Sequence, residues 1–180
     1  MNLTAVLQRH TEHYTTFRRP LWLECYFWFP PPSAIWEIFL PGAVKPWKKR
    51  ILLAEHSPVR KLNFNWKWID LPYWVSVHFV RHKFGIEHFV STQRTDRTGV
   101  EREANRQDAP VMHECFANAQ AVMFISRRRL CAQASAETRA AWRAVVDAIA
   151  EKEPEVAACC VPECVYRGFC PEFKTCGFFG

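Results

Sequence analysis

The chain has 180 residues, of which 49% are hydrophobic and 23% are charged, and its formal net charge is +6. This balance is typical of a globular protein and excludes a largely disordered one. The basic surplus favours anionic partners, from nucleotides to nucleic acid, without choosing among them. The length fits a single domain over residues 1–180, within which residues 157–180 form a cysteine-rich C-terminal tail.

No apolar run in the sequence reaches the roughly 18 residues that a membrane helix needs. The first residues, Met1-Asn2-Leu3-Thr4, lack the basic and apolar regions of a signal peptide. We therefore expect a cytoplasmic protein without a membrane partner. Its eight cysteines are then expected to be thiols or metal ligands rather than disulfides.

The N-terminal third offers few regular patterns. Residues 1–20 are polar and compatible with a short helix, whereas Leu21 to Phe29 is aromatic and strand-like. Pro30-Pro31-Pro32 ends that strand. His56-Ser57-Pro58 marks the boundary of an element, because proline disfavours helix at the residue before it.

The middle of the chain alternates and then becomes continuously apolar. Residues 62–68 place Leu, Phe and two Trp at every second position, which predicts a half-buried strand that Asp70-Leu71-Pro72 breaks. The run from Tyr73 to Val80 fits either a strand or a buried helix. Thr95 to Pro110 is charged and indicates a loop or a frayed helix.

Two helices are predicted after residue 110. Val111 to about Cys131 contains no Gly and no Pro and is helix-compatible, with Phe116, Met123 and Ile125 on its buried side. Ser135 can cap a second helix. That helix has a buried stripe at i, i+3, i+4 and i+7 and is closed by Pro154. The stripe consists of Trp142, Val145, Val146 and Ile149.

The segment from Arg81 to Arg97 is the first candidate site. It opens with Arg81-His82-Lys83, and Ser91 follows after seven intervening residues. Cationic groups at the end of an apolar run are costly unless something anionic meets them. A phosphate is the natural candidate, because guanidinium forks match its oxygens in pairs. The alternative is a basic surface loop.

The tail is the second candidate site. Cys160, Cys164, Cys170 and Cys176 are separated by three, five and five residues, and His113 and Cys115 lie upstream. Only the first gap falls in the range of two to four that is typical of paired zinc ligands. Zinc ligands and buried or unreactive thiols therefore both remain open. The sequence contains no Gly-rich phosphate loop, Walker pattern or Gly-x-Ser-x-Gly elbow.

Arg81-His82-Lys83, seven residues and Ser91 resemble the Arg-His-Arg, seven residues, Ser signature of flavin-dependent thymidylate synthases. Three further segments resemble that family in the same order, over roughly residues 50–150. They are His56-Ser57-Pro58, then Arg106 before Ala109-Pro110, and then Asn118 to Arg129 continuing into Ala134 to Arg139.

The resemblance implies a mixed α/β (α+β) fold, in which an antiparallel sheet is flanked by helices, and a homotetramer with shared active sites. FAD would be held by His56, Arg81, His82, Lys83 and Asn118. The substrate dUMP would be bound by His78, Ser91, Thr92, Gln93, Arg94, Arg106 and Arg129, of which Arg129 and Ser91 are the catalytic candidates.

The implied enzyme is a methyltransferase that makes dTMP from dUMP. In the family reaction NADPH reduces FAD, methylenetetrahydrofolate supplies the one-carbon unit and the reduced flavin supplies the hydride. Arg129 would polarise the pyrimidine as a fixed cation near developing negative charge.

Several positions depart from the family pattern. Lys83 replaces the last arginine of the signature, so a bidentate fork becomes a point charge. His88-Phe89 replaces Asn-Glu, His78 replaces a Gln, and Gln93 replaces an Arg that is offered one residue later by Arg94.

These departures motivate a second hypothesis, a divergent flavin and folate enzyme that modifies another pyrimidine deoxynucleotide or transfers a different one-carbon group. A third hypothesis, of another class, is a nucleic-acid-binding module with a cysteine-held metal. The charge, the aromatic content and the tail favour it, whereas under the first reading nucleic acid is not an expected partner.

Overall fold

The computed structural model describes residues 15–18, 23–27 and 45–178. Their centre is one five-stranded sheet in the order β1-β2-β3-β5-β4, in which every neighbouring pair is antiparallel. The strands are β1 (Thr15–Arg18), β2 (Leu23–Phe27), β3 (Asn63–Pro72), β4 (Ile86–Val90) and β5 (Pro110–Asn118).

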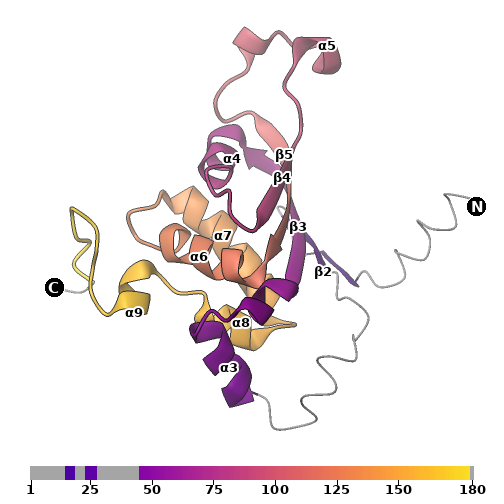
Figure 1. Cartoon of the computed structure of the whole chain (residues 1–180). Helices are drawn as coiled ribbons and strands as arrows, with labels where there is room; N and C mark the ends of the chain where they lie inside the picture. The colour runs from indigo at the N-terminus through magenta and orange to yellow at the C-terminus, as the bar shows by residue number, and fades with distance from the viewer. Residues whose placement is uncertain (1–14, 19–22, 28–44, 179–180) are drawn as a thin grey trace, which may run out of the picture.

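Helices complete the fold, and Figure 1 shows α4, α6 and α7 on one side of the sheet. The helices are α3 (Lys45–Leu53), α4 (Tyr73–Phe79), α5 (Thr95–Thr98), α6 (Ala119–Arg129), α7 (Ala136–Ala150), α8 (Pro154–Cys159) and α9 (Glu163–Arg167). Two 3-10 helices are η1 (Ser57–Lys61) and η2 (Arg102–Ala104). The expected antiparallel sheet flanked by helices is thus confirmed. Within the described ranges, no helix is both long enough and apolar enough to cross a membrane.

The alternation predicted for residues 62–68 is confirmed by β3. Phe64, Trp66 and Trp68 are buried, while the residues between them are partly exposed. The strand does not end at Asp70 as expected. Asp70 takes a φ of 58° within an irregularity, after which pairing with β5 resumes at Leu71. The break is therefore a bulge inside the strand.

The apolar run after Pro72 is helical, since α4 buries Val75, Ser76 and Phe79. The sequence could not decide this, because a short continuous apolar run suits a buried strand equally well. The core on this side of the sheet is aromatic. Trp66 and Trp142 meet edge to face at 5.7 Å, and Trp68 stacks on Phe79 at 4.5 Å between ring centroids.

The helix predicted from Val111 to Cys131 is wrong over its first half. Residues 110–118 form β5, which pairs with both β3 and β4. Its period-two pattern was hidden because a buried His and a buried Cys occupy core-facing positions. Phe116, expected to be buried, is instead 38% exposed. The second half is helical as predicted, with Met123 and Ile125 buried in α6.

The remaining expectations have mixed outcomes. Ser135 caps α7 as predicted, accepting a hydrogen bond from the Thr138 backbone N–H, and the stripe on α7 is buried. The strand predicted over residues 21–29 is confirmed where it is described, as β2. Residues 15–18 are a strand rather than part of a helix. The rest of residues 1–20 and Pro30 to Pro32 lie outside the described residues.

Candidate functional site: a basic cluster between α4 and α6

Three residues from two separate parts of the chain meet where α4 and α6 end. Arg129, in the last turn of α6, donates from Nε to His82 Nε2 over 2.9 Å and from one terminal nitrogen to the His78 carbonyl oxygen over 2.6 Å. His78 lies in the last turn of α4, and His82 lies in the loop that follows. Both histidines and Arg129 are partly buried.

This cluster carries positive charge that is not neutralised. Among the described residues no carboxylate forms an ion pair with Arg129. Two further cations, Arg81 and Arg128, lie close enough to repel its charge. Burial, followed by repulsion from Arg81 and Arg128, lowers the pKa of Arg129. Burial, followed by Arg129, also lowers the pKa of His82 to about 4, so this imidazole stays neutral. A guanidinium without an acidic partner is suited to bind an anion.

His78 is held from a second direction. Its Nδ1 lies 2.9 Å from the Thr138 hydroxyl of α7, and Trp74 contacts the ring edge to face. Burial, followed by the charges of Arg129 and Arg81, lowers the pKa of His78. The neutral ring therefore lies against α7 while its carbonyl orients Arg129.

A hollow lies on the neighbouring surface. It has a volume of about 330 Å³ and is lined by residues that include Glu55, Arg60, Phe84, Gly85, Asn118 and Phe124. Phe84 is 87% exposed beside it. Of the residues predicted to bind a cofactor, Asn118 lines this hollow, whereas His56 is only the chain neighbour of the lining residue Glu55. Arg81 and Lys83 lie in the same loop as Phe84 and are exposed.

Gly85 shapes the wall of this hollow. Its φ is +70°, and a Cβ at this position would lie 2.6 Å from Asn118 Nδ2. The Asn118 side chain in turn accepts a hydrogen bond from the Ala121 backbone N–H over 2.9 Å and so caps α6. A glycine is thus required here both for its backbone conformation and for its close approach to the cap.

The predicted substrate-binding residues that follow β4 lie apart from the cluster around Arg129. Ser91 extends the β4–β5 ladder, since its hydroxyl accepts a hydrogen bond from the Met112 backbone N–H over 3.1 Å. Thr92, Gln93 and Arg94 follow, and Figure 1 shows that the excursion bearing α5 extends away from α6. The Thr92 hydroxyl accepts from the Arg94 backbone N–H.

The two arginines of this excursion have local partners. Arg94 makes a two-pronged contact with Asp96, at 2.9 Å for each pair of atoms, and Arg106 makes one with Asp108 at 2.9 and 3.1 Å. Both pairs are exposed. Within one chain, the structure therefore brings Arg129 together with His78 and His82 but not with Arg94 or Arg106.

The predicted tail ligands do not share one location. Cys164, Cys170 and Cys176 line a cavity of about 470 Å³, and the cysteine that joins them there is Cys131, just after α6. Cys160 is buried, and burial raises the pKa of its thiol to about 11.

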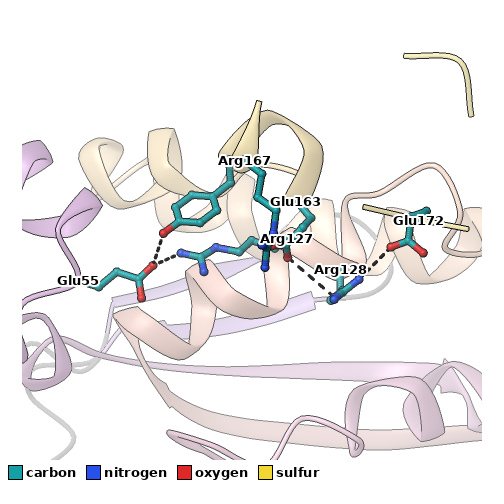
Figure 2. A network of polar contacts seen from close by, with 7 residues as sticks. Glu55, Arg127, Arg128, Glu163, Arg167 and Glu172 are labelled. Carbon is teal, nitrogen blue, oxygen red and sulfur yellow. Dashed lines mark hydrogen bonds and ion pairs between the residues drawn. The ribbon is translucent and has the colours of Figure 1, made fainter. Parts of the chain in front are cut away.

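Ion pairs hold the tail to α6. Figure 2 shows Arg127 directed toward Glu55, and Arg128 between Glu163 and Glu172. The guanidinium carbon of Arg127 lies 3.6 Å from the centroid of the Tyr166 ring, and the Tyr166 hydroxyl donates to Glu55 over 3.1 Å. Two of the three consecutive arginines therefore have acidic partners, unlike Arg129.

Sequence reasoning missed one cluster, formed by His88 of β4 with His113 and Cys115 of β5. His113 and Cys115 were noted only as residues upstream of the tail, and His88 only as a departure from the family pattern. The signal in the sequence was their spacing, since His113 and Cys115 are two residues apart and therefore lie on one face of a strand. Only the register of the sheet places His88 opposite Cys115.

No protein-family model matches the sequence, and no curated protein matches it. The fold, however, is found in solved structures. A thymidylate synthase X from Helicobacter pylori with FAD and dUMP has 15% identity and a TM-score of 0.55, with 78% of this chain and 99% of that chain covered. A second structure is a flavin-dependent thymidylate synthase from the same organism complexed with FAD and dUMP. It has 11% identity and a TM-score of 0.57, with 71% of this chain and 90% of that chain covered.

A third match is a UMP/dUMP methylase, PolB, from Streptomyces cacaoi, bound with 5-Br dUMP. It has 12% identity and a TM-score of 0.55, covering 77% of this chain and 86% of that chain. Identities this low establish the fold alone. The chain therefore has the mixed α/β fold of flavin-dependent thymidylate synthase X and of this nucleotide methylase.

Proposed function

We propose that this protein is a flavin-dependent methyltransferase that converts dUMP to dTMP, with FAD as cofactor and with methylenetetrahydrofolate and NADPH as co-substrates. One observation carries the proposal. Arg129 and His82, which the sequence resemblance marks independently as substrate-binding and cofactor-binding residues, are hydrogen-bonded to each other within an unneutralised basic cluster. The fold shared with thymidylate synthase X supports the same reading.

The role proposed for Arg129 follows from how it is held. Its contacts with His82 and the His78 carbonyl fix the plane of the guanidinium before any ligand arrives. A preorganised cation stabilises negative charge that develops on a substrate without reorganising during the reaction. We propose that Arg129 faces the pyrimidine of the nucleotide in this way.

The residues around Gly85 fit a flavin cofactor. The hollow combines aromatic, amide and guanidinium side chains, which suits a ligand with a flat ring system and a polar chain. At Gly85 its wall leaves no room for a Cβ. Asn118, His56, Arg81, His82 and Lys83 would hold the cofactor. When bound, FAD supplies the hydride for the reaction, and the chain contributes placement and charge.

A shared active site is part of the proposal. Arg94 and Arg106 do not reach Arg129 within one chain, so the excursion that bears them would complete the site of another subunit. Exposed aromatic side chains support an assembly, since Phe84 is 87% and Phe89 is 60% exposed. We propose a homotetramer of single-domain chains. Sedimentation at several concentrations tests this, and a monomer at all of them contradicts it.

A second candidate substrate is favoured by His88 and Phe89. His88 contacts the core residues His113 and Cys115, while Phe89 is exposed on the other face of β4, so neither provides a carboxylate to the substrate. A pyrimidine nucleotide other than dUMP therefore remains the alternative. The fold likeness to a protein described as a UMP/dUMP methylase is in keeping with it.

The first experiment is an absorption spectrum of the purified protein with and without added FAD, followed by a dUMP titration of the flavin bands. Flavin bands that shift with dUMP support both ligands in one site. A colourless protein that neither takes up FAD nor binds dUMP rejects the proposal and favours the metal-containing nucleic-acid module, whose affinity for single-stranded DNA should fall steeply with salt.

Product analysis separates the two candidate substrates. The protein is incubated with FAD, NADPH, methylenetetrahydrofolate and either dUMP, UMP or dCMP, and the nucleotides are identified by mass spectrometry. Methylation of dUMP alone supports the first candidate. Methylation of another pyrimidine nucleotide in preference to dUMP supports the second.

A further inference from the structure

We infer that His88, His113 and Cys115 form a binding site for a divalent transition-metal ion such as Zn²⁺. His88 Nδ1 lies 3.0 Å from His113 Nε2, and Cys115 Sγ lies 3.3 Å from each of these nitrogens. Among the described residues, this is the one group of three His, Cys or acidic side chains whose ligand atoms all lie within 4.8 Å of one another.

The dimensions of the triangle suit zinc. Zinc–nitrogen bonds of about 2.0 Å and zinc–sulfur bonds of about 2.3 Å place tetrahedral ligands roughly 3.3 to 3.5 Å apart. The observed separations of 3.0 to 3.3 Å therefore need to open by only a few tenths of an ångström. The sheet sets this geometry, because His88 pairs opposite Cys115 and His113 lies two residues along the same face of β5.

The tautomer of His88 is fixed for binding. Its Nε2 lies 2.8 Å from the His82 carbonyl oxygen, which can only accept, so this nitrogen carries the proton and Nδ1 presents a lone pair. A hydrogen bond from the second ring nitrogen to a carbonyl is the usual support of a metal-bound histidine. His113 and Cys115 are fully buried, and His113 Nδ1 has no hydrogen-bond partner among the described residues.

Metal binding would also account for a buried thiol that lies against two imidazole rings. Burial lowers the pKa of His113 to about 3, so this ring is neutral. Its proton lies on Nε2, which faces the lone pair of His88 Nδ1, and moves to the unpartnered Nδ1 when Nε2 binds the ion. Burial raises the pKa of the Cys115 thiol, which is therefore protonated without metal. Binding then forms the metal–sulfur bond and releases the thiol proton to solvent, one proton for each ion bound. Three ligands leave a fourth position for water or a substrate atom.

The test uses the full chain, stripped with a chelator under reducing conditions and titrated with Co²⁺. Cys115→Ser and His88→Gln are each expected to bind one equivalent less than the unmodified protein, and the release of one proton should disappear in Cys115→Ser. Cys160→Ser, at a buried thiol outside the cluster, is the matched control and should keep that equivalent. Circular dichroism checks that each variant is folded.

The outcome that overturns the inference is equal stoichiometry in the unmodified protein, Cys115→Ser and His88→Gln. Absence of any bound Co²⁺ or Zn²⁺ at micromolar concentration would overturn it as well. Because the readout is metal stoichiometry, failure of the proposed methyltransferase activity leaves this result unaffected.

A different observation carries a second site. We propose that Cys131, Cys164, Cys170 and Cys176, which line one cavity, together bind a structural zinc ion. The three of these that lie in the tail come from α9 and from the segment after it, and all four are free thiols. This set replaces Cys160 of the sequence-based set with Cys131.

The end of the tail contains no regular element. Residues 168–178 contain no helix or strand, and Phe169 and Phe173 are exposed. Polar contacts attach it to the body, since Arg128 donates to Glu172 over 2.9 Å and Gln133 Nε2 donates to the Lys174 carbonyl over 2.9 Å. Small segments without a core are commonly held by a metal or by disulfides. The four sulfur atoms do not all lie within 4.8 Å of one another, so zinc binding would have to bring them closer together.

Cys160 provides the matched control. Cys131→Ser and Cys170→Ser are each expected to lose one equivalent of zinc, whereas Cys160→Ser should retain it. Cys115→Ser should lose the equivalent of the other site, so combining it with Cys131→Ser should remove both. Loss of that zinc in Cys160→Ser with retention in Cys131→Ser overturns the proposal. A disulfide among the four cysteines, found by mass spectrometry of the protein purified without reductant, overturns it too.

Discussion

Arg129 donates one hydrogen bond to the imidazole of His82 at 2.9 Å and another to the backbone carbonyl of His78 at 2.6 Å. A guanidinium has five N–H groups, so three remain for a ligand. Because neither acceptor is a carboxylate, the positive charge is oriented without being neutralised. This arrangement differs from that of Arg127 and Arg128 in the same turn, which form ion pairs with glutamates.

Replacing Arg129 with lysine should weaken dUMP binding by about ten- to a hundredfold, because a lysine keeps the charge but cannot donate to His82, His78 and a ligand in one plane. Loss of one charged hydrogen bond costs about 1.5 to 3 kcal/mol, which sets this range. The measurement is a dUMP titration of the flavin bands. The exposed Arg143→Lys is the control, and equal dUMP affinity in both variants would refute the role given to Arg129.

Gly85→Ala and Gly99→Ala form a matched pair. Both glycines have a φ near +70°, but a Cβ at Gly99 meets nothing within 4 Å, whereas at Gly85 it meets the side chain of Asn118. Each substitution should cost about 1 to 2 kcal/mol for the left-handed backbone. Gly85→Ala should cost about 1 kcal/mol more, because the α6 cap is displaced.

Urea unfolding of both glycine variants measures this difference, and FAD uptake measures its effect on the hollow. We expect FAD affinity to fall in Gly85→Ala and to be unchanged in Gly99→Ala. If the two variants lose equal stability and bind FAD equally, the contact with Asn118 has no consequence.

Glu55→Gln should destabilise the protein by about 1 to 2 kcal/mol at neutral pH, because Glu55 accepts from Arg127, Gln120 and Tyr166. Burial acts to raise the pKa of Glu55, but the hydrogen bonds from Arg127 and Gln120 prevail, and its net pKa is lowered from 4.5. The unfolded chain then binds more protons below that pH, so this contribution is present above 4.5 and is lost as the pH falls through the folded pKa.

The pH dependence of unfolding by urea checks the contribution of Glu55. The gap between the unmodified protein and Glu55→Gln should close as the pH is lowered below 4.5. Glu101→Gln, at an exposed position, should show no such gap. A gap that persists unchanged at low pH would mean that the Glu55 charge is not its cause.

Ser126→Ala should destabilise the protein by about 1 to 3 kcal/mol, because it leaves a buried indole N–H without an acceptor. The Ser126 hydroxyl accepts from Trp142 Nε1 over 2.9 Å and donates to the Val122 carbonyl over 2.8 Å. Thermal unfolding of Ser126→Ala beside the exposed Ser57→Ala measures the difference. Equal stability of the two would show that the indole finds another partner.

Local patterns by themselves determined much of the fold. The alternation at Phe64, Trp66 and Trp68 identified β3, and the apolar stripe with its serine cap identified α7, because these side chains repeat with the period of their own element. The order of short motifs from His56 to Arg129 indicated the fold family, and the antiparallel sheet flanked by helices agrees with it. The sequence also singled out Arg129 before any contact was known.

Tertiary structure decided what no local period encodes. Val111 to Asn118 became a strand because β3 and β4 both pair with it, although its composition suits a helix. Register, a long-range property, placed His88 opposite Cys115, and packing of the tail on α6 brought Cys131 rather than Cys160 to the other tail cysteines. The positions of Glu55 and Glu172 likewise decide which of the three arginines has no acidic partner. These ion pairs join residues that are far apart in the chain.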